Sequence, residues 1–463
     1  MSHHRTPLVT SLLISILMAF PIFRAPAAPQ NAMVYGDAGR TFADTVGLNV
    51  KYSQGEPQKD LPLLKELGVR WVRDGVSWPE IEPAPGQYVE FPPAFQERLK
   101  FYKTNKIGIV FLLGYENPKA YPDTPDKPHN AFNAKGFGGY AAAVARMLKA
   151  SGVRFTLEIW NEPHNFGIAK AFGGAWNAKA PSPWVDHYIE MAHEAVARVK
   201  AVDPRITMID CDDMWVIHYW FLEKGLPAKL DGFGFHPYAP GGPEKAAVDQ
   251  DTDWVKPFTA VDADGSFQSA VRRLQEAGKA KLGHTPQMWA TEWGWTLGEK
   301  SPRGPVTEEL LAGLLPRAFV TADAAGVKTV CWFSSYDSVD GPMGLRANNG
   351  TKRKMYFAMQ AMTREIGQYR LVKQIAGADH LTSGTQAYLF RHGRHIKAVA
   401  WNIDGPASVT IACNKRGPIS IHDVFGNPLP AAQIANGSIT LTLGPSPIYI
   451  EGIDGDVKLV PNS

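Results

Sequence analysis

The sequence predicts an α/β protein with a (β/α)8 TIM barrel followed by a small C-terminal antiparallel β-sandwich. Three observations support this fold class. From about residue 44 to 365, eight short apolar runs alternate with helical patterns, as in parallel strands joined by helices. Polar residues stand at the ends of several of these runs. Beyond residue 368 the segments become short and alternating, with turns between them, which is typical of an antiparallel sandwich.

The apolar runs are the candidate barrel strands, because a strand buried on both faces is almost wholly apolar. They cover Val46–Tyr52, Val69–Val76, Gly108–Gly114, Phe155–Trp160, Ile206–Cys211, Gly232–Phe235, Gln287–Thr291 and Thr329–Phe333. Helical patterns include Gly139–Ala150, a helix from Pro183 to Val202 with Ser182 as its N-cap, one near Thr307 to Gly326, and Lys354–Gly367. An open doubly wound sheet is the alternative, but no Gly-rich phosphate-binding fingerprint follows an early strand.

The C-terminal region supplies the candidate sandwich strands. They are Gln386–Phe390, His395–Trp401, Ala407–Ala412, Ile419–Val424, Ser438–Leu443 and Pro447–Glu451. Turn pairs such as Asp404-Gly405 and Asn436-Gly437 separate them. The predicted organisation is therefore a signal peptide over residues 1–27, a catalytic barrel over 36–367 and a β-sandwich over 368–463.

The N-terminal residues resemble a secretory signal peptide. Arg5 gives a positive start, Leu8 to Phe23 is apolar, and Ala25-Pro26-Ala27 offers small residues for cleavage. The apolar stretch is short for a membrane span and contains Pro21. A cleaved signal is therefore favoured over an anchor, and we expect a secreted or periplasmic protein without stable membrane insertion.

Charge and cysteine content exclude several classes of partner. The chain has 48 Lys and Arg against 45 Asp and Glu, a formal net charge of +3. This near-neutral balance gives no electrostatic preference for nucleic acid or an acidic membrane, whereas a neutral polysaccharide fits. The 3 cysteines are scattered, and no Cys/His cluster has metal-ligand spacing. We expect no metal, no cofactor and a monomer.

Two glutamates at the ends of apolar runs carry the functional prediction. Glu162 ends the run that begins at Phe155, and Glu292 ends the run that begins at Gln287. A carboxylate there costs desolvation unless it is used. Reactive groups of a barrel collect at the C-terminal ends of its strands. Cleavage of a glycosidic bond needs two carboxyl groups, one protonated and one ionised. Glu158 is a rival acid, for which alternation favours a structural role deeper in the barrel.

Other polar and aromatic residues gather at the same strand ends. Arg73 is a plausible charge partner for one carboxylate, Tyr238 a hydrogen-bond donor to it, and Asn161 a ligand for a substrate hydroxyl. His236 and Trp332 also stand at strand ends. Indole and phenol rings suit the apolar faces of sugars. The remaining candidates for the substrate groove are Tyr115, His164, Trp293, Trp295 and Tyr336.

Two motifs resemble clan A of the retaining glycoside hydrolases. They are Trp160-Asn161-Glu162-Pro163 on the fourth strand and Thr291-Glu292-Trp293-Gly294 on the seventh, with His236-Pro237-Tyr238 and Trp332 matching in order. The resemblance implies that Glu162 is the acid/base and Glu292 the nucleophile. It further implies that Asn161 binds a 2-hydroxyl of the sugar, that Arg73 and Tyr238 hold the nucleophile, and that the Trp332 ring forms the floor of the sugar site.

Within clan A the chain is most similar to family 39. Family 5 usually has a histidine at the end of the third strand, where this chain has Leu113-Gly114-Tyr115-Glu116. The resemblance implies a retaining hydrolase acting by double displacement and is compatible with both endo- and exo-action. We expect endo-action on a polysaccharide or exopolysaccharide. The alternative is an exo-acting, β-xylosidase-like β-glycosidase, and the loops around Tyr115, Trp176, Trp254 and Trp295 decide between them. A transglycosylase and a non-catalytic carbohydrate-binding protein are less favoured.

Overall fold

The computed structural model describes residues 39–175, 182–239, 241–246, 257–301, 304–375, 384–413, 418–453 and 457–460. The predicted signal peptide lies outside the described residues, as do Trp176, Trp254 and the start of the predicted barrel domain. Among the described residues, no helix combines the length and the apolar character that crossing a membrane requires.

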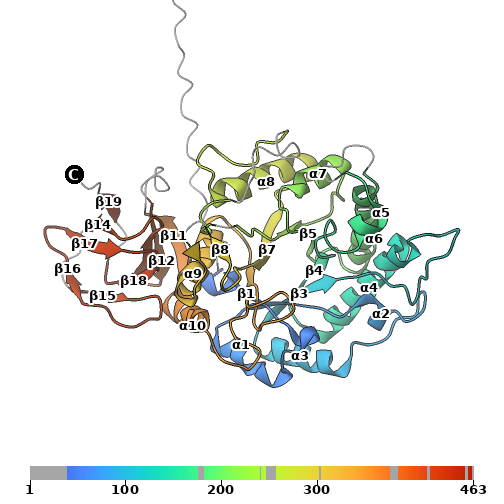
Figure 1. Cartoon of the computed structure of the whole chain (residues 1–463), viewed down its shortest axis with the longest axis horizontal. Coiled ribbons are helices and arrows are strands. Elements are labelled where there is room, and N and C mark those ends of the chain that lie inside the picture. The colour runs from blue at the N-terminus through green and yellow to red at the C-terminus, as the bar shows by residue number, and fades with distance from the viewer. Residues whose placement is uncertain are drawn as a thin grey trace, which may run out of the picture. The chain divides into compact units, whose positions relative to one another are not determined.

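A closed barrel of parallel strands forms the first part of the described chain (Figure 1). Around the barrel the strand order is β1-β10-β7-β6-β5-β4-β3-β2. The strands are β1 (Val46–Asn49), β2 (Trp71–Asp74), β3 (Gly108–Leu113), β4 (Phe155–Ile159), β5 (Met208–Asp212), β6 (Gly232–Phe235), β7 (Gln287–Trp293) and β10 (Val330–Trp332). Because β1 pairs with both β2 and β10, the sheet has no free edge, and the predicted barrel is confirmed.

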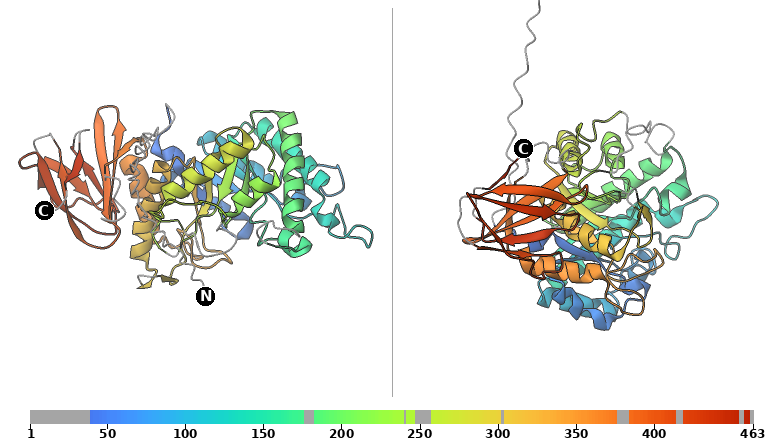
Figure 2. Two further views of the ribbon diagram at one scale, coloured as in Figure 1. Left: turned by 90° about the horizontal axis from the view of Figure 1, so that it is seen from above. Right: turned by 60° about the vertical axis from the view of Figure 1, so that its left-hand side comes forward.

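Helices surround these strands (Figure 2, left). They are α1 (Pro62–Glu66), α2 (Trp78–Ile81), α3 (Pro93–Thr104), α4 (Ala134–Ser151), α5 (Ile168–Phe172), α6 (Pro183–Val202), α7 (Ile217–Lys224), α8 (Phe267–Leu282), α9 (Glu308–Ala324) and α10 (Lys354–Ile366). A short hairpin of β8 (Lys300–Ser301) and β9 (Gly304–Pro305) precedes α9. Most barrel strands are shorter than predicted by one to four residues, whereas β7 extends two residues further, to Trp293.

Helix α6 differs from the prediction at its start. Pro183 occupies the first turn as expected, where its missing N–H costs nothing. The hydroxyl of Ser182, however, donates to the carbonyl of Ala175 at 2.6 Å and does not cap the helix. The helix is instead held by packing, because its apolar face, from Trp184 to Val199, is buried. Packing of such a face contributes more to a helix than its cap does.

Two antiparallel sheets follow the barrel. One has the order β11-β12-β13-β18-β15-β16 and the other β17-β14-β19. Their strands are β11 (Arg370–Gln374), β12 (Thr385–His392), β13 (His395–Asn402), β14 (Ala407–Ala412), β15 (Pro418–His422), β16 (Ala432–Gln433), β17 (Ser438–Leu443), β18 (Ile448–Glu451) and β19 (Lys458–Val460). Side chains such as Leu389, Ile411 and Ile450 form a separate buried core, so the predicted β-sandwich is confirmed.

A buried polar cluster connects the barrel to the sandwich. Glu244, in the segment between β6 and α8, accepts two hydrogen bonds of 2.7 Å from Arg317 on α9. The indole of Trp401 on β13 donates to the same carboxylate at 2.8 Å, and Arg317 also donates to the carbonyl of Pro445 at 3.2 Å. All three side chains are buried. The sandwich therefore contacts the segment between β6 and α8, which also carries Tyr238.

Candidate active site

The C-terminal ends of the barrel strands surround a cavity of about 430 Å³. Arg73 reaches it from β2, Asn161 and Glu162 from the end of β4, Tyr238 from beyond β6 and Glu292 from β7. The other lining residues are Asn49, Val50, Lys51, Ser53, Gln54, Asp74, Gly75, Leu112, Tyr115, Phe166, Phe333, Val339, Asp340 and Met343. The structure thus brings together the two glutamates that the sequence places 130 residues apart.

Glu292 reaches the cavity through an irregularity in β7. Ala290 pairs with Val330, but Trp293 pairs with Trp332, so β7 has one extra residue over this interval. Such a bulge re-aims a side chain at the rim of a barrel. Thr291 lies near the buried Cys211 thiol, with 4.0 Å between Oγ1 and Sγ, and Trp293 packs outward against Phe267. The extra residue leaves Glu292 facing the mouth between them.

Glu292 is held as a carboxylate. Arg73 donates from Nη1 to Oε1, and the Tyr238 hydroxyl donates to Oε2 at 2.9 Å. Burial alone would raise the pKa of Glu292, but the charges of His236, Arg73 and Lys51 and the bond from Tyr238 hold that pKa below 4.5. An ionised carboxylate is the form that a nucleophile requires.

Glu162 lies in a strained turn directly after β4. Trp160 and Glu162 both have left-handed backbone angles, with φ of 65° and 44°. Such residues cost about 1–3 kcal/mol each and persist where the surroundings enforce them. Nδ1 of His236 lies 2.7 Å from Oε1 of Glu162 and 3.7 Å from Oε2 of Glu292. Asn165 donates to the other Glu162 oxygen at 3.3 Å. The turn therefore presents Glu162 to the cavity beside His236.

His236 stands between the two glutamates. Burial alone would lower its pKa, but the carboxylates of Glu292 and Glu162 outweigh burial and raise it above 6.5. One oxygen of each glutamate and one nitrogen of His236 lie within 4.8 Å of one another. Of the two glutamates, only Glu162 lies within hydrogen-bonding distance of His236, so a proton can pass between these two groups, as an acid/base residue requires.

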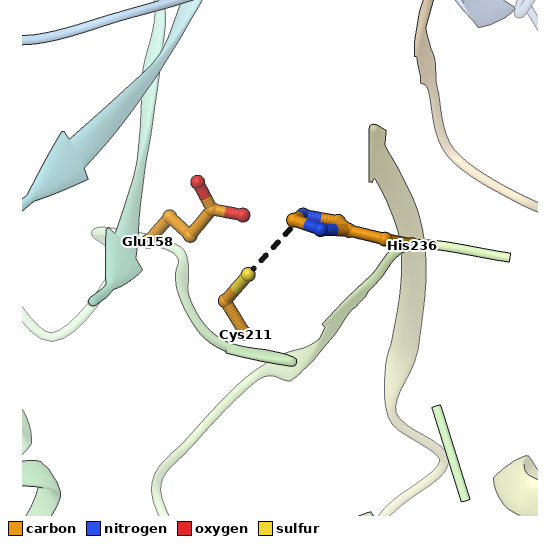
Figure 3. A group of neighbouring side chains, drawn as sticks. All are labelled: Glu158, Cys211 and His236. Carbon is orange, nitrogen blue, oxygen red and sulfur yellow. Dashed lines mark hydrogen bonds between the residues drawn. The ribbon is translucent and has the colours of Figure 1, made fainter. Parts of the chain in front are cut away.

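A second buried layer lies beneath the cavity (Figure 3). Glu158, Cys211 and His236 converge there from β4, β5 and the end of β6, and Sγ of Cys211 lies 3.4 Å from Nε2 of His236. Arg73 donates to Glu158 at 2.5 Å and to Asn161 at 2.6 Å. Glu158 is fully buried and does not line the cavity. Its role in the structure is thus to neutralise part of the positive charge of Arg73.

Three groups of residues bring metal-ligand atoms within 4.8 Å of one another. They are Glu158 with Cys211 and His236, Glu162 with His236 and Glu292, and His164 with Asp212 and Asp213. Arg73 is bonded to a carboxylate in each of the first two groups. Burial raises the pKa of the Cys211 thiol well above its usual range, whereas metals bind the thiolate. Ion pairs and hydrogen bonds thus account for these groups.

His164 holds the turn that carries Glu162. Its ring nitrogens lie 2.7 Å from Asp212 and 2.9 Å from Asp213. Burial alone would lower the pKa of His164, but these two carboxylates raise it to about 10. An imidazolium between two carboxylates ties the residues after β4 to the end of β5. His164 does not line the cavity, so the structure gives it a positioning role and not the predicted contact with substrate.

Several predicted aromatic residues lie away from the cavity. Tyr115 lines it, but Trp293, Trp295, Trp332 and Tyr336 do not. Trp293 and Trp332 are 0% exposed and Trp295 is 4% exposed. Trp332 packs between Trp295 and Phe319 of α9, and the Tyr336 hydroxyl donates to the carbonyl of Asn348. Because side chains alternate along β10, Trp332 faces the helices and Phe333 the cavity.

The sequence did not single out several lining residues. Lys51 and Asp340 lie in loops after β1 and β10, where no strand-end carboxylate draws attention to them. Phe166 and Val339 line the cavity and are 48% and 92% exposed. No local signal distinguishes Phe333, because the residues of β10 and Phe333 itself are all buried.

Known protein structures share this fold. A family 39 glycoside hydrolase from the gut symbiont Bacteroides cellulosilyticus WH2 matches with a TM-score of 0.69 at 18% identity, over 89% of this chain and 81% of that chain. The family 39 enzyme of Xanthomonas axonopodis pv. citri matches with a TM-score of 0.57 at 12% identity, over 89% and 94%. A monomeric β-xylosidase from Caulobacter crescentus CB15 matches with a TM-score of 0.55 at 15% identity, over 89% and 96%.

The resemblance predicted from the motifs is confirmed at the level of the fold, with family 39 enzymes among the structural neighbours. No sequence profile of a protein family matches the chain, and no curated protein sequence matches it. The geometry of the site therefore carries the functional argument.

Proposed function

We propose that this protein is a retaining glycoside hydrolase in which Glu292 is the nucleophile and Glu162 the acid/base. The observation that carries the proposal is the closeness of the two carboxylates, whose nearest oxygens lie within 4.8 Å together with His236. Retaining enzymes have carboxyl groups about 5–5.5 Å apart, whereas inverting enzymes leave about 6.5–9.5 Å for a water molecule. The fold shared with glycoside hydrolases supports the same reaction.

The surroundings of the two carboxylates give them different tasks. Arg73 and Tyr238 keep Glu292 ionised and aimed into the cavity, so that it attacks the anomeric carbon. Glu162, whose Oε1 lies 2.7 Å from Nδ1 of His236, gives a proton to the leaving oxygen. In the second step Glu162 takes a proton from water, which then releases the sugar from Glu292.

Atoms and charges balance over the two steps. The bond between the anomeric carbon and Glu292 forms as the glycosidic bond breaks, and the Glu162 proton leaves with the alcohol. Water then restores that proton and breaks the ester. Asn161 lines the cavity beside Glu162, where its amide is available to a sugar hydroxyl.

We propose endo-action on a polysaccharide, with exo-acting β-glycosidase activity as the second candidate. The side chains of Phe166 and Val339 are exposed at the cavity, which favours a substrate that extends beyond one sugar. The β-xylosidase among the structural neighbours favours the alternative. The ratio of viscosity loss to reducing ends in a digest distinguishes them, because internal cuts lower viscosity early.

The N-terminal sequence supports secretion or a periplasmic location.

Two variants test the assigned roles. Glu162→Gln should lower turnover of glycans by about 10²–10⁴-fold, because general acid catalysis contributes that much. In Glu162→Gln, the rate of glycosyl-enzyme formation should return towards that of the wild type with 2,4-dinitrophenyl glycosides, because their leaving group needs no proton. Glu292→Ala should abolish turnover of both kinds of substrate. Glu97→Gln, an exposed position on α3, is the matched control.

Proton NMR of the first product gives the stereochemistry, and retention is expected. Inversion would exclude Glu292 as nucleophile. Unchanged turnover in Glu162→Gln would show that the carboxylates are not catalytic, and binding without turnover in the wild type would favour a carbohydrate-binding protein. Product analysis with an added acceptor sugar separates hydrolysis from transglycosylation.

A further inference from the structure

A buried lysine stands in the wall of the cavity. Lys51 lies two residues after β1 and is 5% exposed. Its ammonium is 3.2 Å from Oδ2 of Asp340 and 3.8 Å from the centre of the Phe333 ring. All three side chains line the cavity with Glu292. A lysine ammonium has three donors, so Asp340 leaves it with further hydrogen-bonding capacity.

The position of Lys51 relative to the glutamates indicates which part of a substrate it meets. Around the barrel, β1 neighbours β10, and β10 neighbours β7, which carries Glu292. Glu162 follows β4, farther around the barrel. The leaving group must lie beside the acid Glu162, and the attacked sugar must lie over Glu292. Lys51 and Asp340 therefore face the attacked sugar, on the side away from the leaving group.

The charges of the cavity disfavour an anionic sugar. Its lining includes the cations Lys51 and Arg73 and the carboxylates Asp74, Glu162, Glu292 and Asp340. Arg73 is bonded to two glutamates and Lys51 to Asp340, so both lining cations of the described residues already have a carboxylate partner. Asp74 is itself paired with Arg98, which lies outside the lining, so a uronate or sulfate would find no lining cation of the described residues that lacks a carboxylate partner. A hydroxyl would accept from the ammonium and donate to Asp340.

We propose that Lys51 and Asp340 form a hydroxyl-binding pair that restricts the attacked sugar to neutral glycosides and rejects uronic acids and sulfated sugars. The proposal rests on the proposed hydrolase function and adds its substrate class. Lys51 donates a hydrogen bond to a ring hydroxyl remote from the anomeric carbon, and Asp340 accepts the hydrogen of that hydroxyl. The Phe333 ring holds the ammonium from the side. The pair is a recognition device, separate from the acid and the nucleophile.

The test compares 4-nitrophenyl β-D-xyloside, glucoside, galactoside and mannoside with 4-nitrophenyl β-D-glucuronide. The wild type should prefer its best neutral substrate to the glucuronide. Asp340→Asn removes the carboxylate that balances Lys51. Its kcat/KM for the neutral substrate should fall about 10- to 100-fold, because a charge-assisted hydrogen bond is lost, while its relative activity on the glucuronide should rise. Lys51→Met should lower the neutral activity without that relative gain.

The ratio of the two activities is the decisive readout, because a merely structural defect lowers both alike. Lys59→Met and Asp126→Asn, at exposed positions outside the cavity lining, should leave the ratio unchanged. If Asp340→Asn keeps the wild-type ratio, or if the wild type prefers the glucuronide, the pair does not select neutral sugars. If Lys51→Met does not fold, Lys51→Arg, which keeps the charge, should retain the preference for neutral sugars, and loss of that preference would also count against the pair.

Failure of the proposed function has a different signature. In that case the wild type and Glu162→Gln would show the same absence of turnover on every aryl glycoside and on every polysaccharide, including the neutral ones. Turnover that depends on Glu162 but not on Asp340 would retain the hydrolase and overturn only the hydroxyl-binding pair.

Discussion

Removal of the Tyr238 hydroxyl tests how the site keeps Glu292 ionised. Tyr238→Phe deletes the one oxygen that donates to Glu292 Oε2 at 2.9 Å and leaves the ring in place. A hydrogen bond to a charged group contributes about 1.5–3 kcal/mol. One pKa unit corresponds to about 1.36 kcal/mol, so the pKa of Glu292 should rise by about one to two units.

The sign of the pH effect follows from the direction of the shift. The folded protein holds the pKa of Glu292 below 4.5, so Glu292 stabilises the fold above pH 4.5, and that contribution is lost as the pH falls through the folded pKa. Tyr238→Phe should therefore be less stable at pH 7 by up to about 1.5–3 kcal/mol. The difference from the wild type should narrow as the pH falls below 4.5.

The assay is the pH dependence of kcat/KM, whose acid limb reports the free enzyme. The limb should move to higher pH in Tyr238→Phe. Tyr140→Phe is the matched control, because it also removes a buried hydroxyl, one that donates to the carbonyl of Val76 at 2.9 Å and not to a carboxylate. An acid limb that stays in place in Tyr238→Phe, or that moves equally in the control, would refute this account of Glu292.

Two further predictions concern the buried partners of the site. Glu244→Gln should destabilise the protein by about 3–5 kcal/mol in urea unfolding, because it leaves the buried Arg317 without its carboxylate, and a loss below about 1 kcal/mol would contradict the pairing. Cys211→Ala should move the basic limb of the pH profile to lower pH by up to about one unit, because Nε2–H of His236 loses its partner and the imidazolium is disfavoured. Cys331→Ala, also buried, should leave that limb in place.

The sequence predicted the barrel because its periodicity is local. Runs such as Gly108–Leu113 are apolar throughout, which is what a strand buried on both faces requires. Glu162 and Glu292 could be paired for the same reason, since the ends of parallel barrel strands meet at one face. The number of residues between the two glutamates along the chain does not affect this pairing.

The side from which a residue meets the cavity was harder to predict. Trp332 and Phe333 are neighbours of similar character, and a shift of one position reverses which of them faces inward. The extra residue in β7 that re-aims Glu292 has no local signal, because it is defined only by pairing with β10. Lys51 and Asp340 meet through loops, whose conformation depends on contacts distant in sequence.

The polar cluster around Glu244 has a consequence for protein engineering. The carboxylate belongs to the segment that starts with Tyr238, yet it is held by Trp401 and Arg317 from two other parts of the fold. A barrel transplanted without its C-terminal strands would lose the indole donor and expose a buried ion pair next to the segment that supports Glu292. An exchange of domains between this chain and a relative therefore has to move Trp401 and the turn at Pro445 together with the barrel.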